Sequence, residues 1–361
     1  MSLPFEDILS IEPYSLAREE KRALLLDRLR ALTALHYAQC GPYHRMLDAQ
    51  SIIPDSINNI EDFPFLPVSL FKTLTLKSIT DEAVVKTMTS SGTTGQQVSR
   101  IFLDKTTAAY QQKTLVKIVS QFTGAGRLPL LILDTPGVLK DRLQFSARGA
   151  GILGFSLFGS DRAWALDEAM NLDFDAIEAF LSRHAGKRIL LFGFTFMVWQ
   201  HFYKALAASG KTLDLTNALL IHGGGWKKLQ SEAVSPEDFA ARLKSVCGLP
   251  AVHDYYGMVE QTGCIYMQCE QGHLHTSIFS DVIIRQPHDF SSAPVGISGI
   301  IQVLSLLPES YPGHSLLTED EGVLLGEDDC PCGRKGKYFK ILGRLKKAEL
   351  RGCSDTYAVQ F

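Results

Sequence analysis

One short segment combines many hydroxyl groups with glycine, which is the mixture that an anion-binding loop needs. Thr89-Ser90-Ser91-Gly92-Thr93-Thr94-Gly95 carries five hydroxyl side chains and two glycines in seven residues. Hydroxyl and backbone N–H groups can donate hydrogen bonds, and glycine lets the backbone approach a phosphate closely. The segment is neither a Gly-x-x-x-x-Gly-Lys-Ser/Thr P-loop nor a dinucleotide-binding fingerprint. It predicts a phosphate-binding loop of another kind, with an ordinary polar turn as the alternative.

The cysteines and histidines suggest a second kind of chemistry. Because seven cysteines is an odd number in a chain without a signal peptide, metal ligation or reduced thiols explain them better than a disulfide framework. Cys40 and Cys247 lie in apolar or helix-like surroundings and are expected to be small buried residues. A closed structural zinc site with three thiolates and one imidazole is predicted from Cys269, His275, Cys330 and Cys332. His273 and Cys264 are alternative ligands for this site. The other interpretation is that these cysteines are unrelated buried thiols.

These residues need elements that place them, and apolar periodicity predicts such elements. Apolar residues at spacings of three and four over residues 16–37 predict an amphipathic helix that stops at Gly41-Pro42, and a strand over 85–89 leads into the hydroxyl-rich loop. Helix-like segments then alternate with apolar strands, which predicts a largely parallel sheet covered on both faces. Short strands at 280–284 and 299–304 predict an antiparallel region from about residue 272. The alternating helices are expected at 105–122, 174–184, 196–208 and 236–247, and the strands at 128–133, 188–194, 218–221 and 251–253.

Composition excludes several classes of protein. A net charge of -3 with scattered Lys and Arg gives no basic face for nucleic acid. No apolar run reaches the length of about 20 residues that spans a bilayer, and the first nine residues do not form a signal peptide. We therefore expect a cytoplasmic protein of 361 residues with no membrane span, and a homo-oligomer is compatible with this composition.

The hydroxyl-rich loop resembles the phosphate loop of the adenylate-forming ligase superfamily, and other segments resemble its further motifs in the same order. The resemblance implies an α/β fold made of the superfamily's N-terminal domain, with layered α/β sheets over residues 1–344 and a small antiparallel β sub-domain at about 272–344. The matching segments are Ile221-His222-Gly223-Gly224-Gly225-Trp226, Asp254-Tyr255-Tyr256-Gly257-Met258-Val259-Glu260, Leu317-Thr318-Glu319-Asp320-Glu321-Gly322 and Ile341-Leu342-Gly343-Arg344.

The resemblance also implies roles in binding ATP. The loop would hold the phosphates, and Gly223-Gly224-Gly225 would line the adenine. Tyr255-Tyr256-Gly257 would complete the nucleotide site, with Tyr256 packed on adenine. Val259 departs from the usual Thr, and Glu319 replaces the usual Gly. Glu260 would bind Mg²⁺, Asp320 would accept both ribose hydroxyls, and Arg344 would contact ribose or phosphate.

Two branches of the superfamily account for the remaining features. The predicted zinc site resembles one found in some phenylacetate-CoA ligases. Residues 65–72 and 222–227 resemble the acyl-protein synthetases of bacterial bioluminescence (LuxE-like), which end near this point and carry the acyl group on a cysteine near the C-terminus. Only 17 residues follow Arg344, so the usual lid domain is expected to be absent, with a short tail at 345–361. Cys353 in that tail is the expected nucleophile. The lid domain of typical members carries a catalytic lysine, and Lys86, Arg100 or a partner would supply that positive charge here.

The sequence thus predicts an enzyme that activates a fatty or aryl acid as acyl-AMP and passes the acyl group to a thiol. The acceptor would be Cys353, a reductase partner, CoA or a carrier protein, and the expected catalytic residues are Thr94, Glu260 and Cys353. ATP, Mg²⁺ and a structural Zn²⁺ are the expected cofactors. Two alternatives stay open, namely a CoA or carrier-protein ligase and a non-catalytic nucleotide-binding subunit of a biosynthetic complex.

Overall fold

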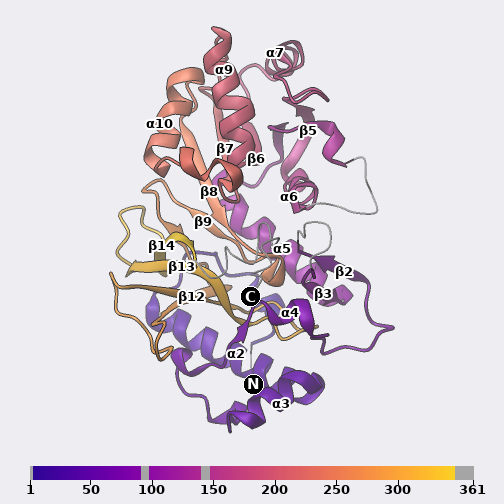
Figure 1. Ribbon diagram of the computed structural model, residues 1–361, viewed down its shortest axis with the longest axis vertical. Helices are drawn as coiled ribbons and strands as arrows, with labels where there is room; N and C mark the ends of the chain where they lie inside the picture. The colour runs from indigo at the N-terminus through magenta and orange to yellow at the C-terminus, as the bar shows by residue number, and fades with distance from the viewer. Residues whose placement is uncertain (1–2, 91–96, 140–146, 346–361) are drawn as a thin grey trace, which may run out of the picture. The chain divides into compact units, whose positions relative to one another are not determined.

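The computed structural model describes residues 3–90, 97–139 and 147–345 (Figure 1). The chain forms two compact units, which are described separately. Unit 1 comprises residues 1–117, 257–266 and 275–361, and unit 2 comprises residues 118–256 and 267–274. None of the helices in the described ranges combines the length and apolarity needed to cross a bilayer.

Unit 2 is built on five parallel strands. Their order is β5-β4-β6-β7-β8, and each neighbouring pair is parallel. The helices between them follow the βα alternation predicted from the sequence. The strands are β4 (Leu128–Ile132), β5 (Gly159–Trp164), β6 (Ile189–Phe194), β7 (Ala218–Gly223) and β8 (Ala251–Tyr256). The helices are α6 (Ala147–Phe155), α7 (Phe174–Arg183), α8 (Thr195–Met197), a π-helix (Val198–Tyr203), α9 (Lys204–Ser209) and α10 (Pro236–Cys247).

Both faces of this sheet are buried, as the continuous apolar strands predict. Leu191 of β6 and Leu220 of β7 join a core that includes Phe239 of α10. On the opposite face, Phe192 of β6 stacks on Phe155 of α6 with ring centroids 4.2 Å apart. The sheet therefore holds its strand ends in fixed positions.

Unit 1 contains the antiparallel sheet β11-β12-β13-β14, formed by β11 (Ser280–Arg285), β12 (Ser298–Ser305), β13 (Ser315–Glu327) and β14 (Lys337–Arg344). The short strand β1 (Leu66–Pro67) pairs in parallel with β13. A separate hairpin consists of β2 (Lys86–Thr89) and β3 (Arg100–Leu103). The short strands β9 (Tyr266–Gln268) and β10 (Leu274–His275) pair with each other, and their residues are divided between the two units.

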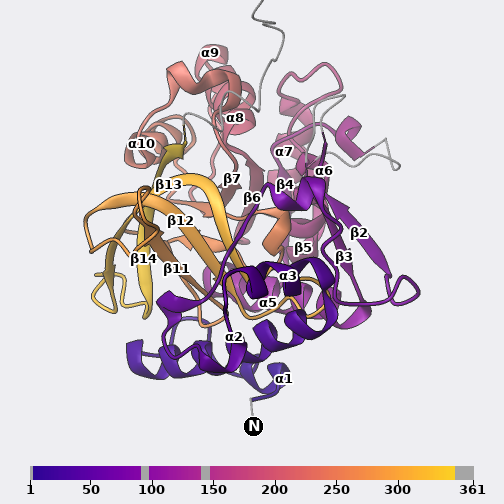
Figure 2. The same cartoon turned by 60° about the horizontal axis from the view of Figure 1, so that its bottom comes forward.

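Helices cover the antiparallel sheet of unit 1. Figure 2 shows α2 (Arg18–Gln39) running along it, and Lys21 of α2 lies 3.7 Å from Asp281 of β11. Leu25, Leu29 and Leu32 of α2 are buried, which is the apolar stripe read from the sequence. The other helices that begin in unit 1 are α1 (Phe5–Ile8), α3 (Gly41–Ala49), α4 (Leu70–Thr73) and α5 (Lys105–Thr123).

The predicted α/β class and the parallel and antiparallel regions are confirmed, with two local differences. The helix expected at 196–208 contains π-turns, and its apolar spacing continues through them, so spacing alone does not reveal them. The N-terminal helix ends at Gln39, but Gly41-Pro42 starts a new helix, because proline is tolerated in a first turn. The predicted body at 1–344 with a sub-domain at about 272–344 stays a prediction. The expected absence of a lid falls beyond residue 345, where the description ends.

Candidate functional site

The hydroxyl-rich segment connects the two strands of the β2–β3 hairpin. Ser90 N–H donates to the Ser99 carbonyl at 3.2 Å, and Ser99 N–H donates to the Ser90 hydroxyl at 2.9 Å. These bonds extend the strand pairing by one step beyond Thr89 and Arg100. The hairpin therefore fixes both ends of the segment. Ser91, Gly92, Thr93, Thr94 and Gly95 lie outside the described residues.

Glu260 is a buried carboxylate facing the base of this hairpin. It lies in a short 3₁₀ turn (Val259–Gln261), and 6% of its surface is exposed. Burial raises the pKa of Glu260, whereas the Ser99 hydroxyl and the Lys72 ammonium lower the pKa and Glu319 raises it. Glu260 has no ion pair within the described part of the chain. A buried carboxylate in this state gains free energy from a bound cation.

Hydrogen bonds hold the backbone around Glu260. The Tyr311 hydroxyl donates to the Glu260 carbonyl at 2.9 Å. The Gln261 amide donates to the carbonyls of Val303 and Gly313 at 3.2 and 2.8 Å. Because these partners are buried and belong to unit 1, the carboxylate is set by the sheet rather than by a free loop.

Asp320 lies on β13 directly opposite Arg344 on β14. Arg344 Nη2 is 3.1 Å from Glu319 Oε2, and Arg344 Nε is 3.8 Å from Asp320 Oδ1. The Asp320 N–H donates to the Thr318 hydroxyl, which itself donates to the Ile301 carbonyl. The strand register thus places a half-exposed carboxylate and a guanidinium side by side.

A series of interactions connects these predicted residues within unit 1. Ser90 bonds to Ser99, Ser99 faces Glu260, and Glu319 influences Glu260 while pairing with Arg344. Arg344 in turn approaches Asp320. The Ser90 hydroxyl, a buried carboxylate and a half-exposed carboxylate connected in this way could bind phosphates, a divalent cation and sugar hydroxyls.

The glycine segment and the two tyrosines belong to unit 2. β7 ends at Gly223, where a Cβ would come within 2.4 Å of the Tyr255 ring. Gly224 has a φ of +79°, and a Cβ there would lie 3.2 Å from Phe194. Glycine is therefore needed for close aromatic packing at the carboxyl ends of β6, β7 and β8. Gly225 follows Gly224 after β7, and Tyr256 follows Tyr255 at the end of β8. Gly257 is the first residue of the 257–266 part of unit 1.

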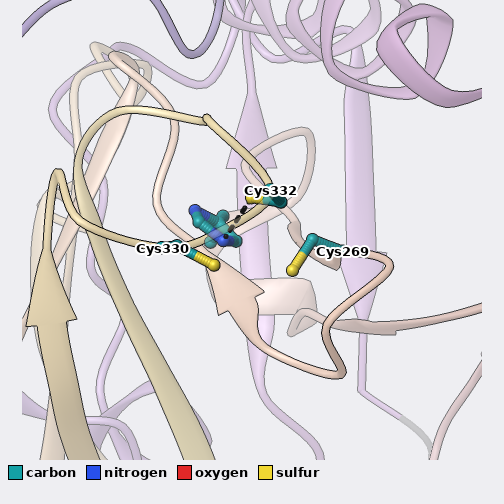
Figure 3. A group of neighbouring side chains, drawn as sticks. Cys269, Cys330 and Cys332 are labelled. Atoms are coloured by element: carbon teal, nitrogen blue, oxygen red, sulfur yellow. Dashed lines mark hydrogen bonds between the residues drawn. The ribbon is translucent and has the colours of Figure 1, made fainter.

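The predicted zinc ligands lie together. One ligand atom from each of Cys269, His275, Cys330 and Cys332 lies within 4.8 Å of the others. Figure 3 shows the three thiols turned toward one another, and Cys332 Sγ is 3.4 Å from His275 Nε2. Zn–S bonds of about 2.3 Å require ligand separations of roughly 3.8 Å in a tetrahedron, so small shifts would close a zinc site.

Local structure distinguishes among the proposed ligands. Cys269 and His275 flank one tight turn, in which Cys269 N–H donates to the His273 carbonyl at 2.8 Å. His273 is not a member of the group, and neither is Cys264, whose thiol donates to the Phe279 carbonyl. Burial raises the pKa of the Cys264 thiol to about 12. The geometry therefore favours His275 as the imidazole ligand.

Sequence reasoning gave no role to Ser99, Lys72 or Tyr311. Ser99 could have been inferred from the pairing of a hairpin around the loop. The effect of Lys72 on the pKa of Glu260 and the hydrogen bond from Tyr311 to Glu260 depend on the fold. Phe158 and Phe192 are buried core residues. Cys40 and Cys247 are buried as expected. Cys353 lies outside the described residues.

Comparisons with known proteins give consistent results. A family model described as "Acyl-protein synthetase, LuxE" matches residues 3–361. The long-chain-fatty-acid–luciferin-component ligases of Vibrio harveyi and Aliivibrio fischeri are each 22% identical over 97% of this chain, which is 91% and 92% of their lengths. Phenylacetate-coenzyme A ligase of Thermus thermophilus is 34% identical over 88 residues, which cover 23% of this chain and 20% of that protein.

Solved structures share the fold. 2-Hydroxyisobutyryl-CoA ligase in complex with 2-HIB-AMP and CoA aligns with a TM-score of 0.71 at 13% identity, covering 91% of this chain and 71% of that chain. Its thioesterification state aligns with a TM-score of 0.70 at 15% identity, with coverages of 95% and 72%. At such identities the likeness establishes the fold alone.

Proposed function

Since the chain belongs to the LuxE family of acyl-protein synthetases, we propose that it activates a long-chain fatty acid with ATP and transfers the acyl group to a thiol. The full-length relatives are named for ligation of a long-chain fatty acid. Their similarity across 97% of this chain supports fatty rather than aryl acids as the substrate class. The enzyme is an acid–thiol ligase that forms AMP.

The observation that supports this proposal is a chain of interactions in unit 1 that runs from Ser90 through Ser99 to Glu260, and from Glu260 through Glu319 and Arg344 to Asp320. The hairpin brings Ser99, the partner of Ser90, to the buried carboxylate, and the strand register brings Asp320 beside Arg344. We assign phosphate binding to residues 90–95 and ribose binding to Asp320. The glycine segment at 223–225 and Tyr255-Tyr256-Gly257 are assigned to the adenine end of the nucleotide.

In the first half-reaction, an oxygen of the fatty carboxylate forms a bond to the α-phosphorus of ATP. The bond from that phosphorus to the bridging oxygen of the β-phosphate breaks, pyrophosphate leaves with the electron pair, and no proton is transferred. Glu260 would hold Mg²⁺, which neutralises phosphate charge when bound. The buried, raised-pKa carboxylate fits this role because it lacks a protein ion pair in the described residues. Loop donors, Thr94 among them, would stabilise charge that grows during transfer.

In the second half-reaction, a thiolate sulfur attacks the acyl carbonyl carbon, the bond from that carbon to the AMP oxygen breaks, and AMP leaves. We assign the thiol to Cys353, where neighbouring Lys and Arg residues of the tail favour the thiolate. A reductase partner would then receive the acyl group. CoA and a carrier protein are the competing acceptors.

We further propose that Cys269, His275, Cys330 and Cys332 bind a structural Zn²⁺. The donor set and its clustering support a closed site, in which the ion links the β9–β10 hairpin to the loop after β13. That loop connects the two strands that carry Asp320 and Arg344. The metal would therefore stabilise the supports of the ribose site rather than take part in chemistry.

The reaction class is tested by ATP–pyrophosphate exchange across long-chain, short-chain and aryl acids. Exchange that depends on long-chain acids is expected. ATP binding without any acid-dependent exchange would instead identify a non-catalytic nucleotide-binding subunit.

The acceptor is tested with a radiolabelled fatty acid and two thiol variants. Cys353→Ala should abolish covalent labelling but retain exchange, whereas Cys40→Ala, which removes a buried thiol, should retain both. If Cys353→Ala still yields wild-type amounts of labelled thioester on CoA or a carrier protein, the protein is a CoA or carrier-protein ligase.

A further inference from the structure

The short segment between β1 and α4 approaches Glu260 from a distant part of the sequence. β1 pairs in parallel with β13, with Pro67 opposite Leu317, and Val68 N–H donates to the Leu317 carbonyl at 2.9 Å. This register ends three residues before Asp320. The chain then turns directly into α4 (Leu70–Thr73). α4 is therefore anchored beside the strand that carries Asp320.

Phe71 fixes α4 against the support of Glu260. The Phe71 side chain is fully buried and meets the Tyr311 ring edge-on, with centroids 6.1 Å apart. The hydroxyl of Tyr311 donates to the Glu260 carbonyl. One aromatic contact and one hydrogen bond thus connect the residue before Lys72 to the backbone of Glu260.

Lys72 follows Phe71 and is exposed. Its ammonium group has neither an ion pair nor a hydrogen bond with any residue that the structure describes, unlike Lys77, which pairs with Asp81. Lys72 is the cation that lowers the pKa of Glu260. The Lys72 ammonium group acts electrostatically on the Glu260 carboxylate and has no partner among the described residues. It is therefore available to bind an anion.

The other candidate cations are less well placed. Lys86 lies opposite Leu103 at the far end of the hairpin, about 13 Å along the strand from Ser90 at roughly 3.3 Å per residue. Arg100 follows Ser99, and alternate residues of a strand point to opposite faces. Because Ser99 faces Glu260, Arg100 points away from it.

We propose that Lys72 is a catalytic residue of the adenylation half-reaction, in which its ammonium group contacts the ATP polyphosphate beside Glu260. This inference rests on the proposed function. As the α-phosphorus gains its bond to the carboxylate oxygen and loses its bond to the β-phosphate oxygen, negative charge accumulates on departing pyrophosphate. Lys72 stabilises that charge and transfers no proton.

Two measurements on full-length protein test this role. Calorimetry without acid should show that Lys72→Met weakens MgATP binding about tenfold and leaves AMP binding unchanged, because AMP lacks the β- and γ-phosphates. Exchange kcat/KM with a long-chain acid should fall about 100-fold, the effect of removing one charge-stabilising donor. Transfer of the acyl group from supplied acyl-AMP should keep its wild-type rate.

Lys72→Arg should retain part of the activity, because it keeps the charge. The matched control is Lys187→Met, which removes an exposed lysine between α7 and β6 of unit 2 and should behave as wild type. If the wild type shows exchange and Lys72→Met matches it, Lys72 has no such role and the proposed function stands. The same conclusion follows if Lys86→Met or Arg100→Met, but not Lys72→Met, loses exchange.

The two proposals can fail separately. A wild type that binds ATP but shows no acid-dependent exchange refutes the adenylation function. In that case the ATP and AMP affinities still decide whether Lys72 binds the polyphosphate. A wild type that binds no ATP refutes both.

Discussion

Gly263, three residues after Glu260, offers a sharp test of how the buried carboxylate is positioned. Its φ is +92°, and an added Cβ would lie 2.6 Å from the Cα and carbonyl oxygen of Gln111. For Gly263→Ala, the left-handed backbone costs about 1–2 kcal/mol. Displacing the Gln111 backbone adds about 1–3 kcal/mol. The free energy of unfolding should therefore fall by roughly 2–5 kcal/mol in total.

Gly296 provides the matched control in the same unit. Its φ is +84°, and a Cβ there would meet nothing within 4 Å. Gly296→Ala should thus cost only the backbone term of about 1–2 kcal/mol. Urea unfolding of both variants measures the difference, and MgATP affinity below the unfolding transition should fall only in Gly263→Ala. Equal losses of stability in the two variants would refute the reasoning, because the contact with Gln111 would then carry no weight.

Three further predictions follow from buried or paired groups. Burial lowers the pKa of His36 from 6.5 to about 3, so its contribution to stability is complete above pH 6.5 and declines as the pH falls. The free energy of unfolding should fall by about 2 kcal/mol between pH 7 and pH 5. Urea unfolding of the wild type and of His36→Gln at both pH values checks whether this pH dependence requires His36. Metal analysis should find one zinc per chain, absent in Cys330→Ser, and a chelator should lower the melting temperature only of the wild type. Asp320→Asn should weaken ATP binding roughly tenfold or more in calorimetry, whereas exposed Asp55→Asn should not.

The sequence was most informative where burial dictates a simple pattern. Apolar runs such as 189–194 and 218–223 predict buried parallel strands, because both faces of such a sheet exclude water. The composition of the Ser-Gly-Thr-rich segment predicts an anion-binding loop or a polar turn, and this stays a prediction because residues 91–95 lie outside the described part of the chain. β3, with only four residues, is too short for a periodic signal.

The site itself depended on contacts that no local pattern encodes. Lys72 influences the pKa of Glu260 because β1 pairs with β13 and Phe71 packs on Tyr311. Asp320 stands opposite Arg344 in a β13–β14 register that shifts twice, between Leu324 and Gly326 and between Glu321 and Gly322. Predicting either placement requires knowing which strands pair and where their bulges lie.

The most direct test of the central claim is a crystal structure of the protein with bound MgATP. We predict the triphosphate against residues 90–95 and Lys72, the metal on the Glu260 carboxylate, and both ribose hydroxyls about 3 Å from the Asp320 carboxylate. A nucleotide bound elsewhere, with Glu260 and Asp320 free of contacts to it, would contradict the account.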